Sequence, residues 1–318
     1  MKRFVLALSF LVVFGVASAQ LVKKHGALSV KGTQLVDATG NPIQLRGVSY
    51  GWHTFWPRFY NASSVKWVVN DWGATVIRAA MGVEPEDGYL KDSVWSEKLI
   101  TTVVDAAIKN NVYVIIDWHC HHLQLDAAKV FFRKMATKYG KCPNVIYEIF
   151  NEPERQSWPE VKSYSEEVIK VIRSIDPDNV ILVGNPHWDQ DLDVVADNPI
   201  VGHTNIMYSL HFYANTHRQE LRAKGDYALS KGIPLFVSEC ASMEASGDGP
   251  VDYTEWQKWI DWMEKNRLSW VIWSISDKNE TCSMLSPRAK TEGNWDDKVL
   301  RETGKLTRAT VRKYNGIQ

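Results

Sequence analysis

Residues 145–153 read VIYEIFNEP. The first six are almost all β-branched, aliphatic or aromatic, which is typical of a short strand buried on both faces. The run ends at Asn151-Glu152-Pro153, where two polar side chains and a proline replace the apolar residues. In α/β proteins, side chains at the carboxyl ends of parallel strands form the functional site. The segment therefore predicts a buried strand that carries polar groups into such a site.

Short apolar runs and longer amphipathic segments alternate along most of the chain. Eight strands are expected, at residues 44–49, 75–81, 112–118, 145–150, 180–184, 206–212, 234–238 and 270–275. Helices are expected between them, at residues 63–72, 96–110, 125–138, 158–174, 191–196, 218–230, 253–265 and 296–314. This order predicts an α/β fold, a (β/α)8 TIM barrel. Residues 27–30 and 33–36 predict a short N-terminal β-hairpin at the barrel floor. An open doubly wound sheet is disfavoured because no glycine-rich phosphate loop follows the first strand.

The start of the chain has the features of a signal peptide over residues 1–19. Lys2 and Arg3 precede an apolar run at residues 4–16, and the small residues Ala17-Ser18-Ala19 follow. The run is shorter than the roughly 20 residues of a membrane-spanning helix. We therefore expect a secreted, extracellular protein. Residues 20–318 contain no linker-like tract, so we expect one catalytic domain without a carbohydrate-binding module.

The composition restricts the choice of partners. Lys and Arg together number 37, as do Asp and Glu, so the formal net charge is zero. This balance gives no support for binding to nucleic acid or to an anionic membrane surface. The chain has 14 tryptophans, whose indole faces can serve as platforms for sugar rings. We expect a monomer.

Polar and ionisable residues gather at the ends of the expected strands. They are Arg78, Asp117, His119, Asn151, Glu152, His211, Tyr213 and Glu239, with Trp273 inside the last strand. The two glutamates follow the fourth and seventh strands, which lie nearly opposite each other in a barrel. Glycoside hydrolysis needs two such carboxyls, and a separation of ~5–5.5 Å leads to retention of anomeric configuration. The pattern therefore predicts a glycoside hydrolase.

Several segments resemble glycoside hydrolase family 5, and in particular its bacterial-type endo-β-1,4-glucanase (cellulase) subfamily. They are residues 28–35, 71–73, 78–81, 113–119, 144–148, 151–153, 210–214, 236–239 and 276–280. The resemblance runs from about Gly26 to Leu306. It implies a retaining endo-β-1,4-glucanase that acts on β-glucan polysaccharides or oligosaccharides through a covalent glycosyl-enzyme, with no cofactor.

The resemblance also implies roles for individual residues. Glu152 matches the acid/base and Glu239 the nucleophile, so the pKa of Glu152 is expected to be raised and Glu239 to be ionised. The matching substrate-binding positions are Arg78, His119, Asn151, His211, Tyr213, Trp273, Lys278 and Glu280, with Trp188 on the leaving-group side. Phe55 and Trp56 after the first strand and Ala245 after the seventh complete the expected cleft.

Three departures from the family pattern concern specificity. Cys240-Ala241 follows the nucleophile position where the family usually has Trp-Gly, and Gly82 stands where relatives have a tyrosine. The first-strand loop at residues 50–60 lacks the His-Gly pair of close relatives. An endo-β-mannanase or a broad-specificity β-glucanase therefore remains an alternative. A sugar-binding barrel without activity is disfavoured because both glutamates are present, and a phosphate-metabolising barrel because no phosphate-binding glycine loop follows the last two strands.

Two cysteine-containing features lead to further expectations. His119-Cys120-His121-His122 contains metal-ligand residue types, but adjacent side chains rarely point to one centre, so no metal site is predicted. Cys240 and Cys282 follow adjacent strands at the top of the barrel, and we expect them to form a disulfide. Cys120 and Cys142 are expected at opposite ends of the barrel and unpaired.

Overall fold

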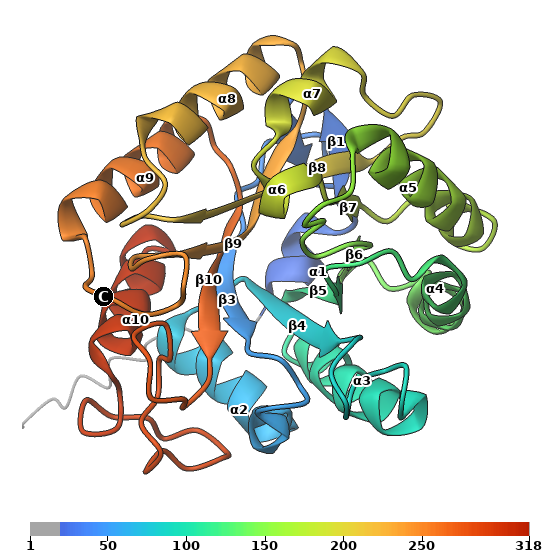
Figure 1. Ribbon diagram of the computed structural model, residues 1–318. Coiled ribbons are helices and arrows are strands. Elements are labelled where there is room, and N and C mark those ends of the chain that lie inside the picture. The colour runs from blue at the N-terminus through green and yellow to red at the C-terminus, as the bar shows by residue number, and fades with distance from the viewer. Residues whose placement is uncertain (1–19, 318) are drawn as a thin grey trace, which may run out of the picture.

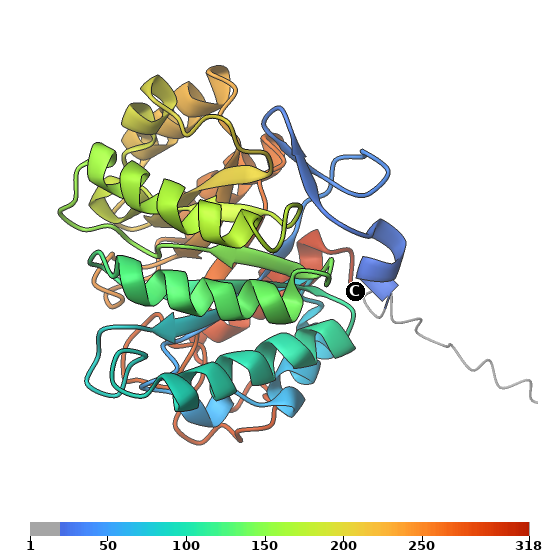
Figure 2. The same ribbon diagram turned by 90° about the vertical axis from the view of Figure 1, so that its right-hand side faces the viewer.

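The computed structural model describes residues 20–317, so the predicted signal peptide at residues 1–19 lies outside the described part. Within the described part, none of the helices combines the length and apolar character needed to cross a bilayer. The chain begins with a short helix, α1 (Leu21–His25), and an antiparallel hairpin of β1 (Ser29–Lys31) and β2 (Gln34–Val36). Figure 2 shows α1 and the hairpin together at one end of the molecule.

Eight parallel strands close into a barrel in the order β10-β3-β4-β5-β6-β7-β8-β9, which confirms the predicted TIM barrel and its N-terminal hairpin (Figure 1). The strands are β3 (Arg46–Tyr50), β4 (Val76–Gly82), β5 (Tyr113–His119), β6 (Val145–Glu148), β7 (Ile181–Val183), β8 (Ile206–Tyr213), β9 (Leu235–Ala241) and β10 (Trp270–Ile275). Each overlaps its predicted strand because buried parallel strands have nearly continuous apolar runs.

Helices surround the barrel (Figure 1). They are α2 (Ala62–Trp67), α3 (Ser93–Lys109), α4 (Leu125–Tyr139), α5 (Trp158–Arg173), α6 (Pro186–Asp189), α7 (Leu192–Asp197), α8 (Gln219–Ser230), α9 (Tyr253–Lys265) and α10 (Glu302–Tyr314), with short turns η2 (Pro57–Phe59) and η3 (Val68–Trp72). The last helix begins later than the predicted residue 296. The segment before it forms an antiparallel bridge between Leu285 and Leu300 instead.

Successive side chains along each strand point alternately into the barrel and outward to the helices, which gives two separate hydrophobic cores. On β5, Tyr113 and Ile115 point into the barrel and pack with Leu28 and Leu35 of the hairpin region, which closes the barrel floor. Val114 belongs to the larger core between the strands and the helices. Because side chains alternate along a strand, residues 117 and 119 share the inward face of residues 113 and 115. Polar side chains are thereby directed into the upper half of the barrel.

The tryptophans of α9 pack against the barrel. Trp256 and Trp259 belong to the core between strands and helices. The ring of Trp259 stacks on Phe212 of β8, with ring centroids 3.9 Å apart and planes 8° from parallel. These residues hold the helix on the outer face of the sheet, and neither tryptophan lines a cavity at the carboxyl ends of the strands.

The predicted disulfide between Cys240 and Cys282 is wrong, and all four cysteines are free. Cys240 follows the inward-facing Glu239, so alternation turns it outward into the core between strands and helices, where its thiol donates to the Val271 carbonyl at 3.3 Å. Cys282 packs instead beside Ala241 and Trp273 above the barrel. The two thiols therefore lie on opposite faces of β9.

Candidate active site

Two adjoining cavities form one cleft at the carboxyl ends of the strands. The larger has a volume of about 670 Å³ and the smaller about 530 Å³. His121, Glu152, Tyr213 and Ala245 line both. We call the first the Trp273 side and the second the Trp188 side, after one aromatic residue that lines each.

The cleft brings together most of the residues predicted for substrate binding. The Trp273 side is lined by Phe55, Trp56, His119, Glu152, Tyr213, Glu239, Ala245, Trp273, Lys278 and Glu280. The Trp188 side is lined by Glu152, Trp188, His211, Tyr213 and Ala245 among others. Arg78 and Asn151 line neither cavity, since both are fully buried beneath them.

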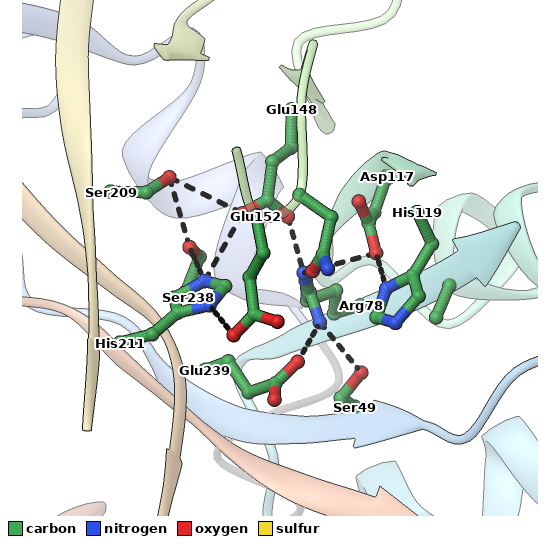
Figure 3. Close-up of polar contacts among 12 residues, drawn as sticks. Ser49, Arg78, Asp117, His119, Glu148, Glu152, Ser209, His211, Ser238 and Glu239 are labelled. Atoms are coloured by element: carbon green, nitrogen blue, oxygen red, sulfur yellow. Dashed lines mark hydrogen bonds and ion pairs between the residues drawn. The ribbon is translucent and has the colours of Figure 1, made fainter. Parts of the chain in front are cut away.

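Arg78 is the centre of the polar network under the cleft (Figure 3). Its Nε donates to Glu148 at 2.6 Å, and its Nη1 donates to Glu239 at 2.8 Å. Its Nη2 lies 3.0 Å from an Asp117 oxygen. Burial opposes the positive charge, but these three carboxylates outweigh burial and raise the pKa of Arg78 well above its ordinary value. The guanidinium therefore remains charged.

Glu239 is held at both carboxyl oxygens. The Tyr213 hydroxyl donates to Oε1 at 2.6 Å, and Arg78 donates to Oε2 at 2.8 Å. Two donors from different strands fix the plane of the carboxyl group. Hydrogen bonds of this kind favour the ionised form and restrict the direction from which Glu239 can attack.

Glu152 has a different environment from Glu239. Its Oε1 lies 2.9 Å from His211 Nδ1, and its Oε2 lies 3.7 Å from His121 Nδ1. A carboxyl oxygen of Glu152 and one of Glu239 lie within 4.8 Å of each other. This spacing suits the retaining geometry of ~5–5.5 Å better than the ~6.5–9.5 Å that leaves room for water in inverting enzymes.

The pKa of Glu152 is lowered, contrary to the expectation from sequence. Burial raises it, but the hydrogen bond and charge of His211, followed by the charge of His121, outweigh burial. Burial and the neighbouring Glu152 raise the pKa of Glu239 despite Arg78. The pKa shifts of Glu152 and Glu239 are therefore the reverse of those expected from sequence. The hydrogen bond and the charge of His211, which sequence alone does not show, are the main causes of the lowered pKa of Glu152.

The floor of the Trp273 side is built from two stacked rings. His119 lies against Trp273 with ring centroids 5.2 Å apart and planes 7° from parallel. Asp117 holds His119 Nδ1 at 2.6 Å, while burial lowers the pKa of His119 well below its ordinary value. Asn151 accepts a hydrogen bond from Arg78 at 2.5 Å, and its Nδ2 has no partner among the described residues.

Metal binding is not favoured by the arrangement of these side chains. In the His119-Cys120-His121-His122 run, His119 faces the cleft while Cys120 packs in the outer core. Two other groups of side chains contain carboxylate and imidazole atoms that lie within 4.8 Å of one another inside each group. Both groups include His211. Each contains a carboxylate already bound by Arg78, which supplies the positive charge that a metal ion would otherwise provide.

Several residues of the site were not predicted from sequence. Trp52, His121, His187, Gln190, His217, Ser246, Gly247 and Cys282 also line the cleft. Glu148, Asp189 and Ser238 are buried beneath it. Asp117, identified from sequence at the end of the third strand, is buried there too, two residues before His119 on the same inward face. No comparable signal marks Asp189, which belongs to α6.

The sequence and the structure both resemble those of known cellulases. Residues 36–279 match the family model described as cellulase (glycosyl hydrolase family 5). An endoglucanase of Clostridium saccharobutylicum is 42% identical over 306 residues, covering 94% of this chain and 68% of the relative. Across the endoglucanase relatives, this chain spans 58% to 68% of their own length.

Solved structures give the same result. One from Cytophaga hutchinsonii has a TM-score of 0.92 and 44% identity, covering 93% of this chain and 98% of that one. The catalytic domain of Thermobifida fusca endoglucanase Cel5A, solved as a variant in complex with cellotetraose, has a TM-score of 0.88 and 35% identity, covering 92% and 99%. Together with the paired glutamates above a closed barrel, these matches show that the chain is an enzyme that belongs to glycoside hydrolase family 5, the cellulase family.

Proposed function

We propose that this enzyme is a secreted endo-β-1,4-glucanase that hydrolyses internal bonds of cellulose and related soluble β-glucans with retention of configuration. The observation that carries this proposal is the separation of less than 4.8 Å between a Glu152 and a Glu239 oxygen. Such a gap leaves no room for a water molecule between the anomeric carbon and the second carboxylate. Glu239 or Glu152 must then attack the sugar directly.

The shape of the cleft supports one assignment of the two roles. Glu152 lines both sides of the cleft, whereas Glu239 lines only the Trp273 side. An acid that protonates the bridging oxygen must reach the junction between the two halves of a bound chain. A nucleophile needs to reach only the anomeric carbon of one half. Glu152 is therefore the acid/base and Glu239 the nucleophile.

The reaction proceeds in two displacements. Glu239 attacks the anomeric carbon, the glycosidic C–O bond breaks, and Glu152 gives its proton to the departing oxygen. Glu152 then removes a proton from water, whose oxygen attacks the same carbon and releases Glu239. Positive charge develops at the anomeric carbon beside Glu239 and favours its ionised form. Glu152 then carries the proton that it gives to the departing oxygen as the bond breaks.

The choice of glucan rests on the relatives and on the floor of the cleft. The similar proteins are endoglucanases, and one was solved with cellotetraose. In this chain the stacked Trp273 and His119 offer a flat apolar surface to a pyranose ring. Lys278 and Glu280 form an ion pair at 2.5 Å that lines the same side and can bond sugar hydroxyls. The single-domain organisation, the signal peptide and the monomeric state remain predictions from sequence.

Activity on three polysaccharides tests the proposed function. Carboxymethyl cellulose, lichenan and glucomannan are incubated side by side, and viscosity is followed together with reducing ends. We expect a rapid fall in viscosity on the two glucans, with initial products of β configuration in proton NMR. A preference for glucomannan would support a mannanase instead, and α-configured initial products would exclude the retaining mechanism.

Trp273→Ala is expected to lower kcat/KM on every β-glucan, because Trp273 lines the cleft. Trp256→Ala is the matched control. It removes a core indole that is 3% exposed, so the free energy of unfolding should fall by ~3–5 kcal/mol. Urea unfolding and initial rates measured on both variants separate the two effects. Near-normal activity of Trp273→Ala would show that substrate binds elsewhere.

A further inference from the structure

Asp189 is a buried carboxylate with no role in the two displacements described above. It follows His187 and Trp188, and all three have left-handed backbone conformations with φ of 52°, 57° and 61°. This turn directs Trp188 outward, 41% exposed, and leaves Asp189 fully buried. Left-handed conformations are unfavourable for residues other than glycine, so consecutive ones persist only where the surroundings require them.

The two oxygens of Asp189 have different surroundings. Oδ1 accepts a hydrogen bond from the Asn185 backbone at 2.6 Å. Oδ2 accepts no hydrogen bond from the described residues, and it lies 3.3 Å from His211 Nε2. A buried carboxylate oxygen without a donor is unfavourable unless a charge lies beside it. Burial raises the pKa of Asp189 well above its ordinary value, and the charge of His211 opposes this effect. His211 is the group that can provide that charge.

His211 connects Asp189 to the acid/base. Its Nδ1 lies 2.9 Å from Glu152 Oε1 on the cleft side. Its Nε2 lies 2.9 Å from the Ser238 hydroxyl, and 3.7 Å from Glu148. The Ser238 hydroxyl donates onward to Ser209 (Figure 3). The imidazole is therefore held between Glu152 in the cleft and a buried polar group.

We propose that Asp189 is a positioning residue that acts through His211 on Glu152, by fixing the orientation and charge of the imidazole that contacts the acid/base. This inference rests on the proposed role of Glu152. Asp189, Glu148, Glu152 and Glu239 all act on His211 to favour its protonated form, against burial, and raise its pKa well above the ordinary value. Removing one of these four groups should therefore lower the pKa of His211.

The position of Asp189 also links it to the part of the cleft that binds the leaving group. Trp188 and Asp189 are adjacent in one rigid turn. Trp188 lines the side of the cleft where the leaving part of the glucan lies, and Asp189 contacts the histidine beside Glu152. The same turn therefore positions Trp188, which contacts the departing sugar, and Asp189, which acts through His211 on the proton donor Glu152.

Asp189→Asn tests the proposal, because asparagine keeps the size and the acceptor for Asn185 but removes the charge. His211 should then lose its proton at lower pH, and a neutral His211 lowers the pKa of Glu152 less. The alkaline limb of kcat/KM on cellotetraose should therefore move to higher pH. At the optimum, kcat/KM should fall by roughly 10-fold, because the imidazole that contacts Glu152 loses the partner that fixes its orientation. This loss is a fraction of the ~10²–10⁴-fold that general acid catalysis contributes.

A second substrate distinguishes this effect from a structural one. 2,4-Dinitrophenyl β-cellobioside has a leaving group that needs no proton, so its kcat/KM and pH profile should be unchanged in Asp189→Asn. Asp191→Asn is the matched control, since Asp191 pairs with His187 and Lys224 in the same region without contacting His211. It should behave as the unmodified enzyme on both substrates.

Equal losses on both substrates, or an unchanged profile on cellotetraose, would overturn the proposal. Asp189→Ser provides a second carboxylate-free variant, and it should shift the cellotetraose profile in the same direction. The unmodified enzyme gives an independent readout that requires no activity, because nitrogen-15 shifts report the protonation of the His211 ring. We expect both ring nitrogens to be protonated at pH 7.5, and a neutral ring would contradict the proposal. If the unmodified enzyme cleaves neither substrate, the proposed function fails, and the His211 measurement still decides this inference.

Discussion

Azide is expected to give opposite anomers with the two glutamate variants. Glu239→Ala removes the nucleophile, so azide attacks from the face that the carboxylate vacated and forms the α-glycosyl azide. Glu152→Ala keeps the nucleophile and still forms a glycosyl-enzyme from 2,4-dinitrophenyl β-cellobioside. It then stalls, because no base activates water, until azide attacks and gives the β-glycosyl azide.

The rates should differ as clearly as the products. Without azide, Glu239→Ala should lose roughly 10⁵–10⁶-fold in kcat, as expected for removal of a catalytic nucleophile. Glu152→Ala should lose roughly 10²–10⁴-fold on cellotetraose but much less in the glycosylation of the activated substrate. NMR of the azide products and burst kinetics provide the measurements. The same anomer from both variants, or exchanged rescue patterns, would show that the roles are misassigned.

Glu154→Ala is the matched control for these variants. Glu154 lies two residues after Glu152 and near His122 and Arg155, whose side chains are exposed. It lines neither side of the cleft. Its loss should change kcat/KM by less than roughly twofold, in line with surface substitutions of less than about 0.5 kcal/mol.

Arg78→Met should unfold more easily than any surface variant. The substitution removes the only cation within 3.0 Å of Asp117, Glu148 and Glu239 among the described residues, and leaves those carboxyls buried. Removing one partner of a buried ion pair lowers the free energy of unfolding by about 3–5 kcal/mol. Activity should fall as well, because Glu239 loses the donor that holds its Oε2. Urea unfolding and kcat/KM test both effects.

The destabilisation by Arg78→Met should depend on pH in a defined direction. Burial raises the pKa of Glu148, but Arg78 and His211 outweigh burial and lower the pKa to about 2. The unfolded value is about 4.3. A lowered folded pKa contributes stability that is fully present above the unfolded pKa and is lost as pH falls through the folded one. The Glu148 part of the difference between the two proteins should therefore be greatest above pH ~4.3 and shrink toward pH ~2.

Arg155→Met serves as the control for the arginine variant. The Arg155 side chain is 87% exposed and contacts Glu154 at 3.6 Å. Exposed pairs of this kind contribute about 0–1 kcal/mol. A loss of stability in Arg78→Met no larger than in Arg155→Met would show that the buried carboxyls are neutral in the folded protein.

The local pattern of the sequence was sufficient to predict the barrel. Continuous apolar runs such as residues 145–150 can be satisfied only when both faces are buried, and eight of them in alternation with amphipathic segments require helices around a closed parallel sheet. The ends of those runs identified the cleft, because Glu152 and Glu239 stand where burial would otherwise favour apolar residues. These features depend on near neighbours in the chain.

Other features depend on groups that are distant in sequence, and only the tertiary structure decided them. Cys240 faces outward because the inward position is taken by Glu239, so adjacency of two strand ends did not place its thiol near Cys282. The lowered pKa of Glu152 depends on His211, 59 positions away. The position of Asp189 follows from a left-handed turn of three residues. Electrostatic interactions and backbone turns of this kind act through space between different strands, and no periodic pattern in the sequence records them.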